Sequence, residues 1–165
     1  MTEFILSEEA PIAQSVLSDI LREMGFPAAV DVEETPDQII LTVTSEQPLG
    51  LLIGKGGQTL NAMELIVKQI TQHRMKGHGK HLMIDAEGYR ERHAERLREL
   101  ARDVADRVVE SGEAISMEPM NARDRRTVHM VVSEIDGIAT YSAGEDPYRY
   151  VVVCLPGQEP EGATQ

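Results

Sequence analysis

Apolar residues recur along the chain in two periods, one typical of helices and one typical of strands. Repeats at three- and four-residue spacing predict helices, and short β-branched runs bounded by turn residues predict strands. The predicted helices span 8–24, 49–53, 60–70, 86–111 and 119–136. The predicted strands span 30–33, 39–44, 81–85, 115–117, 138–142 and 148–155. The fold class is therefore α+β: an α-β-β-α-α-β unit, then a long helix and a smaller α/β unit.

The long helix is rich in Arg and Glu and ends at Gly112. In its second half, apolar residues recur on one face of the helix. They are Leu97, Leu100, Val104 and Val108. Such a pattern is typical of a solvated helix with one packed stripe. We expect it to act as a rigid connector between two small cores.

The apolar runs and the cysteine content limit where this protein can work. The longest runs, 39–41 and 151–155, are far shorter than the roughly 20 residues that cross a bilayer. The N-terminus carries acids where a secretory signal carries cations. Cys154 is the one cysteine and sits in a Val-rich strand, so we expect a buried thiol without a disulfide. The sequence predicts a cytoplasmic protein with no membrane insertion.

Charge is distributed unevenly, although the net charge is −12. Residues 1–48 hold one basic and ten acidic side chains, whereas residues 49–83 hold five basic and one acidic. A local positive patch on an acidic body suits a protein that holds an anionic strand at one place. Ordinary scatter of surface charge is the alternative interpretation.

A glycine-rich loop lies inside this basic stretch. Gly54, Lys55, Gly56 and Gly57 come directly before an amphipathic helix. Backbone amides at a helix N-terminus attract phosphate oxygens, and Lys55 adds a charge beside them. The loop lacks the Lys-Ser or Lys-Thr of a Walker A motif. A simple structural turn is the alternative.

With this loop in place, residues 8–85 resemble a type II KH domain. The resemblance implies that the loop clamps about four nucleotides of single-stranded RNA. It also implies an aliphatic groove for the bases, for which the candidates are Ile53, Thr59, Leu60 and the strand at 81–84.

A second candidate site lies in the predicted helix after Pro119. Arg125 and His129 are four residues apart and share one helix face. An exposed pair of this kind can hold phosphate, Arg through its planar fork and His as a second donor that strengthens on protonation. An ordinary wet helix face is the alternative. Tyr148 and Tyr150 could form a stacking face, or they could be half-buried packing residues.

Residues 86–156 resemble the small domain named for its Arg-x-x-x-His motif, a three-stranded sheet packed by two helices. The order of the two domains resembles the bacterial Jag family of RNA-binding proteins. By this resemblance Arg125 and His129 take the motif roles, and Arg149 matches the basic residue after the Pro. The residues expected to bind nucleic acid are then Ile53, Gly54, Lys55, Gly56, Gly57, Thr59, Arg125, His129 and Arg149.

The resemblance also suggests a function in the cell. It implies post-transcriptional control linked to growth or division and a small KH-only protein as partner. A homo-oligomer is left open by the sequence. Single-stranded DNA is an alternative ligand. Many family members carry an extra N-terminal domain, which we expect to be missing here because the first helix begins near residue 8. Roles that depend on that domain, such as a link to membrane-protein insertion, are not carried over.

Two other classes of function compete with RNA binding. A protein-interaction adaptor is the serious alternative. A phosphohydrolase built on Arg125, His129 and Asp124 lacks a nucleophile with its base, a carboxylate cluster or a cofactor loop, so we expect no enzyme and no cofactor. His73, His78 and His81 lack the Cys or clustered acids of a metal site, so we expect no metal.

The predicted layout has four parts. It comprises a flexible N-terminus at 1–7, a KH domain at 8–85, the connector helix with the Arg-x-x-x-His domain at 86–156, and a disordered tail at 157–165.

Overall fold

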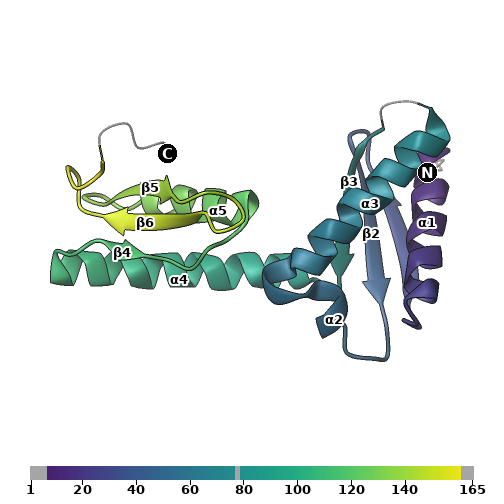
Figure 1. Ribbon diagram of the computed structural model, residues 1–165, viewed down its shortest axis with the longest axis horizontal. Helices are drawn as coiled ribbons and strands as arrows, with labels where there is room; N and C mark the ends of the chain where they lie inside the picture. Colours follow the sequence, from purple (N-terminus) through teal and green to yellow (C-terminus); the bar gives the residue numbers. More distant parts are fainter. Residues whose placement is uncertain (1–6, 77–78, 161–165) are drawn as a thin grey trace, which may run out of the picture. The chain divides into compact units, whose positions relative to one another are not determined.

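The computed structural model describes residues 7–76 and 79–160 and divides the chain into two units (Figure 1). The first unit comprises residues 1–90 and the second residues 91–165. Most of the predicted flexible N-terminus, residues 1–6, lies outside the described residues. The helix α4 (Tyr89–Ser111) carries the chain from one unit into the next.

The first unit is a three-stranded sheet with helices on one face. Its elements are α1 (Glu9–Glu23), β1 (Ala29–Glu34), β2 (Gln38–Thr44), α2 (Gly50–Ile53), the 3-10 turn η1 (Lys55–Gly57), α3 (Gln58–Met75) and β3 (His81–Ala86). The strand order is β1-β2-β3, with β1 antiparallel and β3 parallel to β2. β1 and β2 form an antiparallel hairpin, and the element order is the one expected.

Strict alternation along β2 explains the layering of this unit. Ile39, Leu41 and Val43 are fully buried, while the residues between them are half-buried. Since side chains of a strand alternate between the two faces of a sheet, one face packs on a core and the other stays open. The helices α1 and α3 pack side by side and cover the buried face.

The second unit contains a smaller antiparallel sheet. Its elements are α4, β4 (Ile115–Ser116), α5 (Ala122–Ser133), β5 (Ala139–Ala143) and β6 (Tyr150–Cys154). The strand order is β4-β6-β5, so the Val-rich β6 is central and all its residues from Val151 to Cys154 are buried. With two such units, the α+β fold class is confirmed.

α4 does more than connect, because it supplies part of the second core. Its buried residues are Leu97, Ala101, Val104, Ala105 and Val108. Leu100, which was expected on this face, is 49% exposed. A period of 3.6 residues puts Leu97, Ala101, Val104 and Val108 on one narrow stripe and leaves Leu100 beside it.

α5 begins three residues later than predicted. Pro119 was expected to open the helix, but the first helical residue is Ala122 and the cap is Asn121. The Asn121 Oδ1 atom accepts a hydrogen bond from the Asp124 backbone amide at 3.0 Å, which satisfies one free donor of the first turn. The Met120 amide instead donates to the Arg149 carbonyl at 3.0 Å.

The chain end after β6 is attached to the second unit as far as the structure describes it. Gln158, predicted to lie in a disordered tail, donates from Nε2 to the Gly112 carbonyl at 3.0 Å, and its Oε1 accepts from the Leu155 amide at 3.0 Å. Residues 161–165 of that predicted tail lie outside the described residues.

Cys154 is buried and unpaired, as expected. Burial raises the pKa of the thiol, and the charge of Glu159 adds to the shift. Within the described ranges, no helix is both long and apolar enough to cross a bilayer.

Candidate nucleic-acid interface

The loop between α2 and α3 is made by three glycines with positive φ angles. These angles are +71° at Gly54, +58° at Gly56 and +79° at Gly57. Gly54, with a ψ of 178°, occupies a region of backbone space that essentially only glycine enters. The sequence at this loop therefore permits a backbone path that other residues would not follow.

The loop leaves the N-terminus of α3 open. Gly57 is the N-cap of this helix, no side chain caps it, and no acidic residue lies in its first turn. Free amides and the positive end of the helix dipole together favour an anion at this point. Lys55 is exposed beside them. This arrangement suits one or more phosphate groups.

The three glycines have different surroundings. A Cβ atom on Gly54 would lie 2.3 Å from Thr59 Oγ1, and a Cβ atom on Gly57 would lie 3.1 Å from the ring of Tyr89. A Cβ atom on Gly56 would meet nothing within 4 Å. Gly54 and Gly57 thus allow close packing inside the unit, while Gly56 faces open space where a ligand backbone can approach.

The predicted aliphatic groove is only partly at the surface. Leu60, Leu82 and Ile84 belong to the buried core, so the prediction that they line a groove for bases is wrong. They lie on inward-facing positions of α3 and β3. Ile53 and Thr59 are half-buried beside the loop.

One apolar residue beside the loop was missed by sequence reasoning. Leu51 in α2 is 81% exposed, whereas Leu49 and Leu52 are buried. Because Leu49 and Leu52 are three residues apart, they share one helix face, and this spacing could have shown that Leu51 points away.

Lys80, a cation of the basic stretch at 49–83, is engaged within the fold. Its Nζ atom lies 2.8 Å from Glu34 Oε1 and donates to the Thr35 carbonyl at 2.9 Å. Arg90 is likewise structural, since its Nε donates to the Ile84 carbonyl at 2.7 Å and it pairs with Glu64. Both cationic groups therefore serve the fold of the first unit rather than a ligand.

The second candidate site is built around a buried arginine. Arg125 is only 8% exposed, so the expectation of an exposed Arg/His pair is wrong for this residue. Its Nη1 atom donates to the Met120 carbonyl at 2.8 Å and lies 3.2 Å from Asp146 Oδ1. The carboxylate thus occupies a donor that a phosphate could use.

His129 ties α5 to β5. Its Nδ1 atom lies 2.8 Å from Thr140 Oγ1, and its Nε2 atom lies 2.9 Å from Ser142 Oγ. Burial lowers the pKa of His129, and the charges of Arg125 and Arg149 lower it further. Its surroundings therefore favour the neutral ring, which works against the strengthening on protonation that the sequence suggested.

Arg149 adds a second positive charge near His129, alongside that of Arg125. Its charge acts on the His129 ring, and its buried Nε atom has no hydrogen-bond partner within the described part of the chain. The structure therefore brings together the three residues that the sequence singled out in this half. We call them the arginine cluster.

Asp124, the acid named in the phosphohydrolase alternative, is bound to two neighbouring side chains. Its Oδ2 atom lies 2.9 Å from His93 Nε2 and accepts from Asn121 Nδ2 at 3.0 Å. These contacts join α4 to the start of α5. The carboxylate therefore has a structural role at this helix start.

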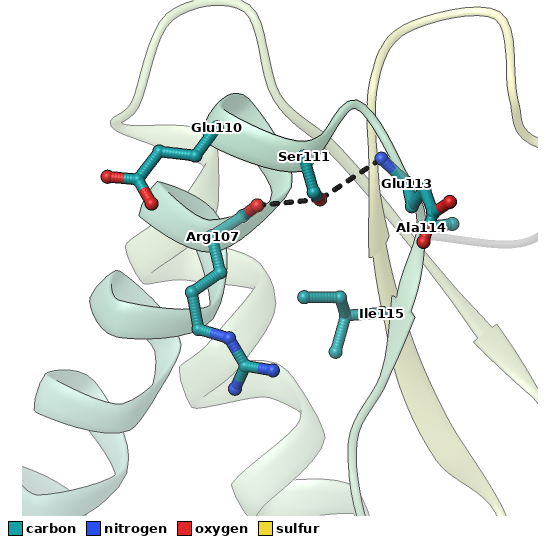
Figure 2. Close-up of a pocket in the computed structure, with 6 residues that line it drawn as sticks. All are labelled: Arg107, Glu110, Ser111, Glu113, Ala114 and Ile115. Atoms are coloured by element: carbon teal, nitrogen blue, oxygen red, sulfur yellow. Dashed lines mark hydrogen bonds between the residues drawn. The ribbon is translucent and has the colours of Figure 1, made fainter.

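A shallow hollow lies at the end of α4 and contains none of the candidate site residues (Figure 2). It is lined by Arg107, Glu110, Ser111, Glu113, Ala114 and Ile115. Ser111 closes the helix there, donating to the Arg107 carbonyl at 2.8 Å and accepting from the Glu113 amide at 3.2 Å. In Figure 2 the Glu110 carboxylate points away from the Arg107 guanidinium. Two acids and one base give this hollow no preference for an anion.

His73 and His81 are both exposed, and His78 lies outside the described residues. In the ranges that the structure covers, no three His, Cys, Asp or Glu side chains are grouped so that they could hold a metal ion.

Comparison with known proteins finds a matching family model for each half of the chain. The family model described as the KH domain of KhpA/KhpB matches residues 14–84, and the model of the domain named for the Arg-x-x-x-His motif matches residues 95–155. RNA-binding protein KhpB of Bacillus subtilis (strain 168) is 36% identical over 147 residues, which cover 87% of this chain and 70% of the relative. The chain belongs to the Jag (KhpB) family.

Other relatives in the KhpB family match over less of their own length. RNA-binding protein KhpB of Clostridium symbiosum is 32% identical over 132 residues, covering 80% of this chain and 59% of the relative. RNA-binding protein KhpB of Streptococcus pneumoniae serotype 2 is 30% identical over 152 residues, covering 92% of this chain and 46% of the relative. The chain thus spans between 46% and 70% of the length of these three relatives. The family resemblance noted from the sequence is confirmed.

Proposed function

We propose that this chain binds single-stranded RNA, with the glycine loop as the main phosphate contact and the arginine cluster as a second one. The relatives that match both halves are named RNA-binding proteins. The expected site residues are Ile53, Gly54, Lys55, Gly56, Gly57 and Thr59 in the first unit and Arg125, His129 and Arg149 in the second.

The observation that carries the proposal is the uncapped start of α3 behind the loop. An 18-residue helix whose first turn has neither a capping side chain nor an acid favours an anion at its N-terminus. Gly56 lets a sugar-phosphate backbone come close, and Lys55 supplies a flexible charge.

The test is a double substitution, Lys55→Asp with Gly56→Asp. It sets two negative side chains against the strand, and the open space around Gly56 leaves the core untouched. We expect the affinity for a single-stranded RNA to fall at least about tenfold, or about 1.4 kcal/mol. Fluorescence anisotropy of a labelled strand measures the affinity, and a thermal melt checks the fold.

The chain offers a matched control in Arg22→Asp with Gly25→Asp. This pair changes the net charge equally and also places Asp at a positive-φ glycine with no atom within 4 Å of its Cβ position. It lies outside the basic stretch, so RNA affinity should stay within about twofold. Native affinity in a folded loop variant would exclude the glycine loop as the main contact.

A protein-interaction adaptor is the second candidate, favoured by the exposed Leu51 and by Leu65 and Ile66 on α3. An adaptor would show no shift of labelled RNA, whereas an RNA-cleaving enzyme would shorten it. Incubating labelled RNA with the protein and resolving it on native and denaturing gels separates these outcomes. We expect a shifted band and an intact strand.

Finer parts of the proposal rest on the family alone. They are post-transcriptional control linked to growth or division, a cytoplasmic location, the absence of catalysis, and a small KH-only protein as partner. Crosslinking in cells followed by sequencing of the bound RNA, with mass spectrometry of co-purified proteins, tests the targets and the partner together.

A further inference from the structure

The loop between β5 and β6 holds an aromatic side chain in solvent. Tyr148 is 74% exposed, and no other Phe or Tyr of the described residues is a large exposed side chain. The chain has only 4% aromatic residues and no Trp. Single exposed apolar residues are common on proteins, so exposure alone does not indicate a function.

The backbone of this loop is anchored on both sides of Tyr148. Before it, Asp146 contacts Arg125, and the Tyr148 amide donates to the Glu145 carbonyl at 2.7 Å. After it, the Arg149 carbonyl accepts from the Met120 amide at 3.0 Å. The ring is therefore presented from a fixed backbone, which lowers the entropy lost when something stacks on it.

The neighbouring tyrosine shows the contrast. Tyr150 is half-buried, and a Cβ atom on Gly144 would lie 3.3 Å from its ring. Tyr150 thus packs inside the unit, whereas most of Tyr148, two residues earlier, is open to solvent. Of the two interpretations of these tyrosines, packing fits Tyr150 and a free ring face fits Tyr148.

Two arginines are linked to the loop that carries this ring. The next residue is Arg149, whose buried Nε has no hydrogen-bond partner among the residues that the structure covers, and Arg125 holds the loop at Asp146. A single nucleotide has an anionic group and a flat π-face a short distance apart. We propose that Tyr148 is a stacking platform for an unpaired nucleobase whose phosphate is held by Arg149, while Arg125 holds the loop in place through Asp146.

This inference rests on the proposed RNA-binding function and adds to it a residue that contacts a base. Stacking on an aromatic side chain tolerates any base, because each base has a π-face. The second unit would then bind single strands without strong sequence preference. A paired strand would bind poorly, since its bases are already stacked on one another.

The test uses Tyr148→Trp in the full chain, which has no other Trp. Trp emission is recorded while a single-stranded RNA of about 12 nucleotides is added, and anisotropy of the labelled strand is followed in parallel. We expect the emission to be quenched along the same binding curve. An RNA of equal length without bases should bind through its phosphates and leave the emission unchanged.

Val109→Trp is the matched control, because Val109 is also exposed and lies on α4 of the same unit. Its emission should not respond to RNA. Two further variants measure the contribution to affinity: Tyr148→Ala should weaken binding about tenfold, and Tyr148→Phe, which keeps the ring, should stay within about twofold.

Each outcome decides the matter. RNA binding by anisotropy without quenching in Tyr148→Trp overturns the stacking role and leaves the proposed function standing. An equal loss for Tyr148→Ala on strands with and without bases also overturns it. If the wild-type chain binds no single-stranded RNA, the proposed function fails and this inference fails with it.

Discussion

Glu34 and Lys80 form a well-buried ion pair of the first unit. The Glu34 side chain is 1% exposed; its Oε2 atom accepts from the Ser7 amide at 2.7 Å, and its Oε1 atom lies 2.8 Å from Lys80 Nζ. Burial alone would raise the pKa of Glu34, but the bonds from Lys80 and Ser7 outweigh it and hold the pKa below its usual value. The charged carboxylate therefore stabilises the fold.

Replacing Glu34 with Gln should lower the free energy of unfolding by about 1–3 kcal/mol at pH 7. A group whose pKa is lower in the folded state contributes stability above its unfolded pKa of about 4.3 and loses it as pH falls through the folded pKa. The gap between wild type and variant should thus narrow as the pH falls below about 4.3. Urea unfolding at pH 7 and pH 3.5 measures both. A gap that persists at low pH would show that charge is not the cause.

His129 gives a pH dependence in a higher range. Because its pKa is lowered in the folded state, its contribution to stability is full above about 6.5, the unfolded value, and is lost as pH falls through the folded pKa. His129→Gln should cost about 1–2 kcal/mol at pH 7.5 by removing bonds to Thr140 and Ser142.

That cost should shrink between pH 7.5 and pH 5.5, since the wild type alone loses the contribution of the neutral ring. Urea unfolding of both proteins at the two pH values checks this. His73→Gln, a change at an exposed position of α3, is the control. A cost that grows on acidification would mean that the folded protein prefers the charged ring.

At the scale of elements, two glycines of the same loop should differ in what they contribute, Gly54 mainly to stability and Gly56 mainly to RNA binding. Gly54→Ala would place a Cβ 2.3 Å from Thr59 Oγ1 on a backbone that only glycine adopts, so we expect a loss of about 3 kcal/mol or more. Gly56→Ala meets no atom within 4 Å, and its left-handed backbone should cost about 1–2 kcal/mol.

RNA affinity should not follow stability, because the variant that loses less stability, Gly56→Ala, changes the surface that meets the ligand. Gly56→Ala should weaken binding several-fold in a protein that is still folded, because the new methyl group projects toward the ligand. Chemical denaturation and anisotropy on the same samples measure the two quantities. Equal stability of both variants would contradict the packing of Thr59 on the loop.

At the scale of the whole molecule, the small basic stretch on an acidic chain limits the electrostatic part of binding. Single strands release about 0.7 counterion per neutralised phosphate. If roughly three to five phosphates are contacted, the plot of log affinity against log salt should have a slope of about −2 to −4. Anisotropy titrations at several salt concentrations measure it, and Lys55→Asp with Gly56→Asp should flatten the slope. A slope near zero in the wild type would favour the adaptor.

Much of the fold was predictable, because helix and strand periods are local. The alternation along 39–44 and the spacing of Leu97, Val104 and Val108 are visible in the sequence, and both match the buried faces. The glycine loop and the Arg-x-x-x-His spacing were visible for the same reason. Two predictions were wrong in detail. Leu100 lies beside the buried stripe of α4 rather than on it, and α5 begins after the Asn121 cap rather than at Pro119.

The sequence by itself determined the order of the elements, the family, and the positions of the two candidate sites, the glycine loop and the Arg-x-x-x-His helix. Only the tertiary structure decided the state of individual side chains. It buried Leu60 and Arg125, paired Lys80 with Glu34, and left Tyr148 in solvent. These outcomes depend on contacts between residues far apart in the chain, and a local pattern carries no information about such neighbours.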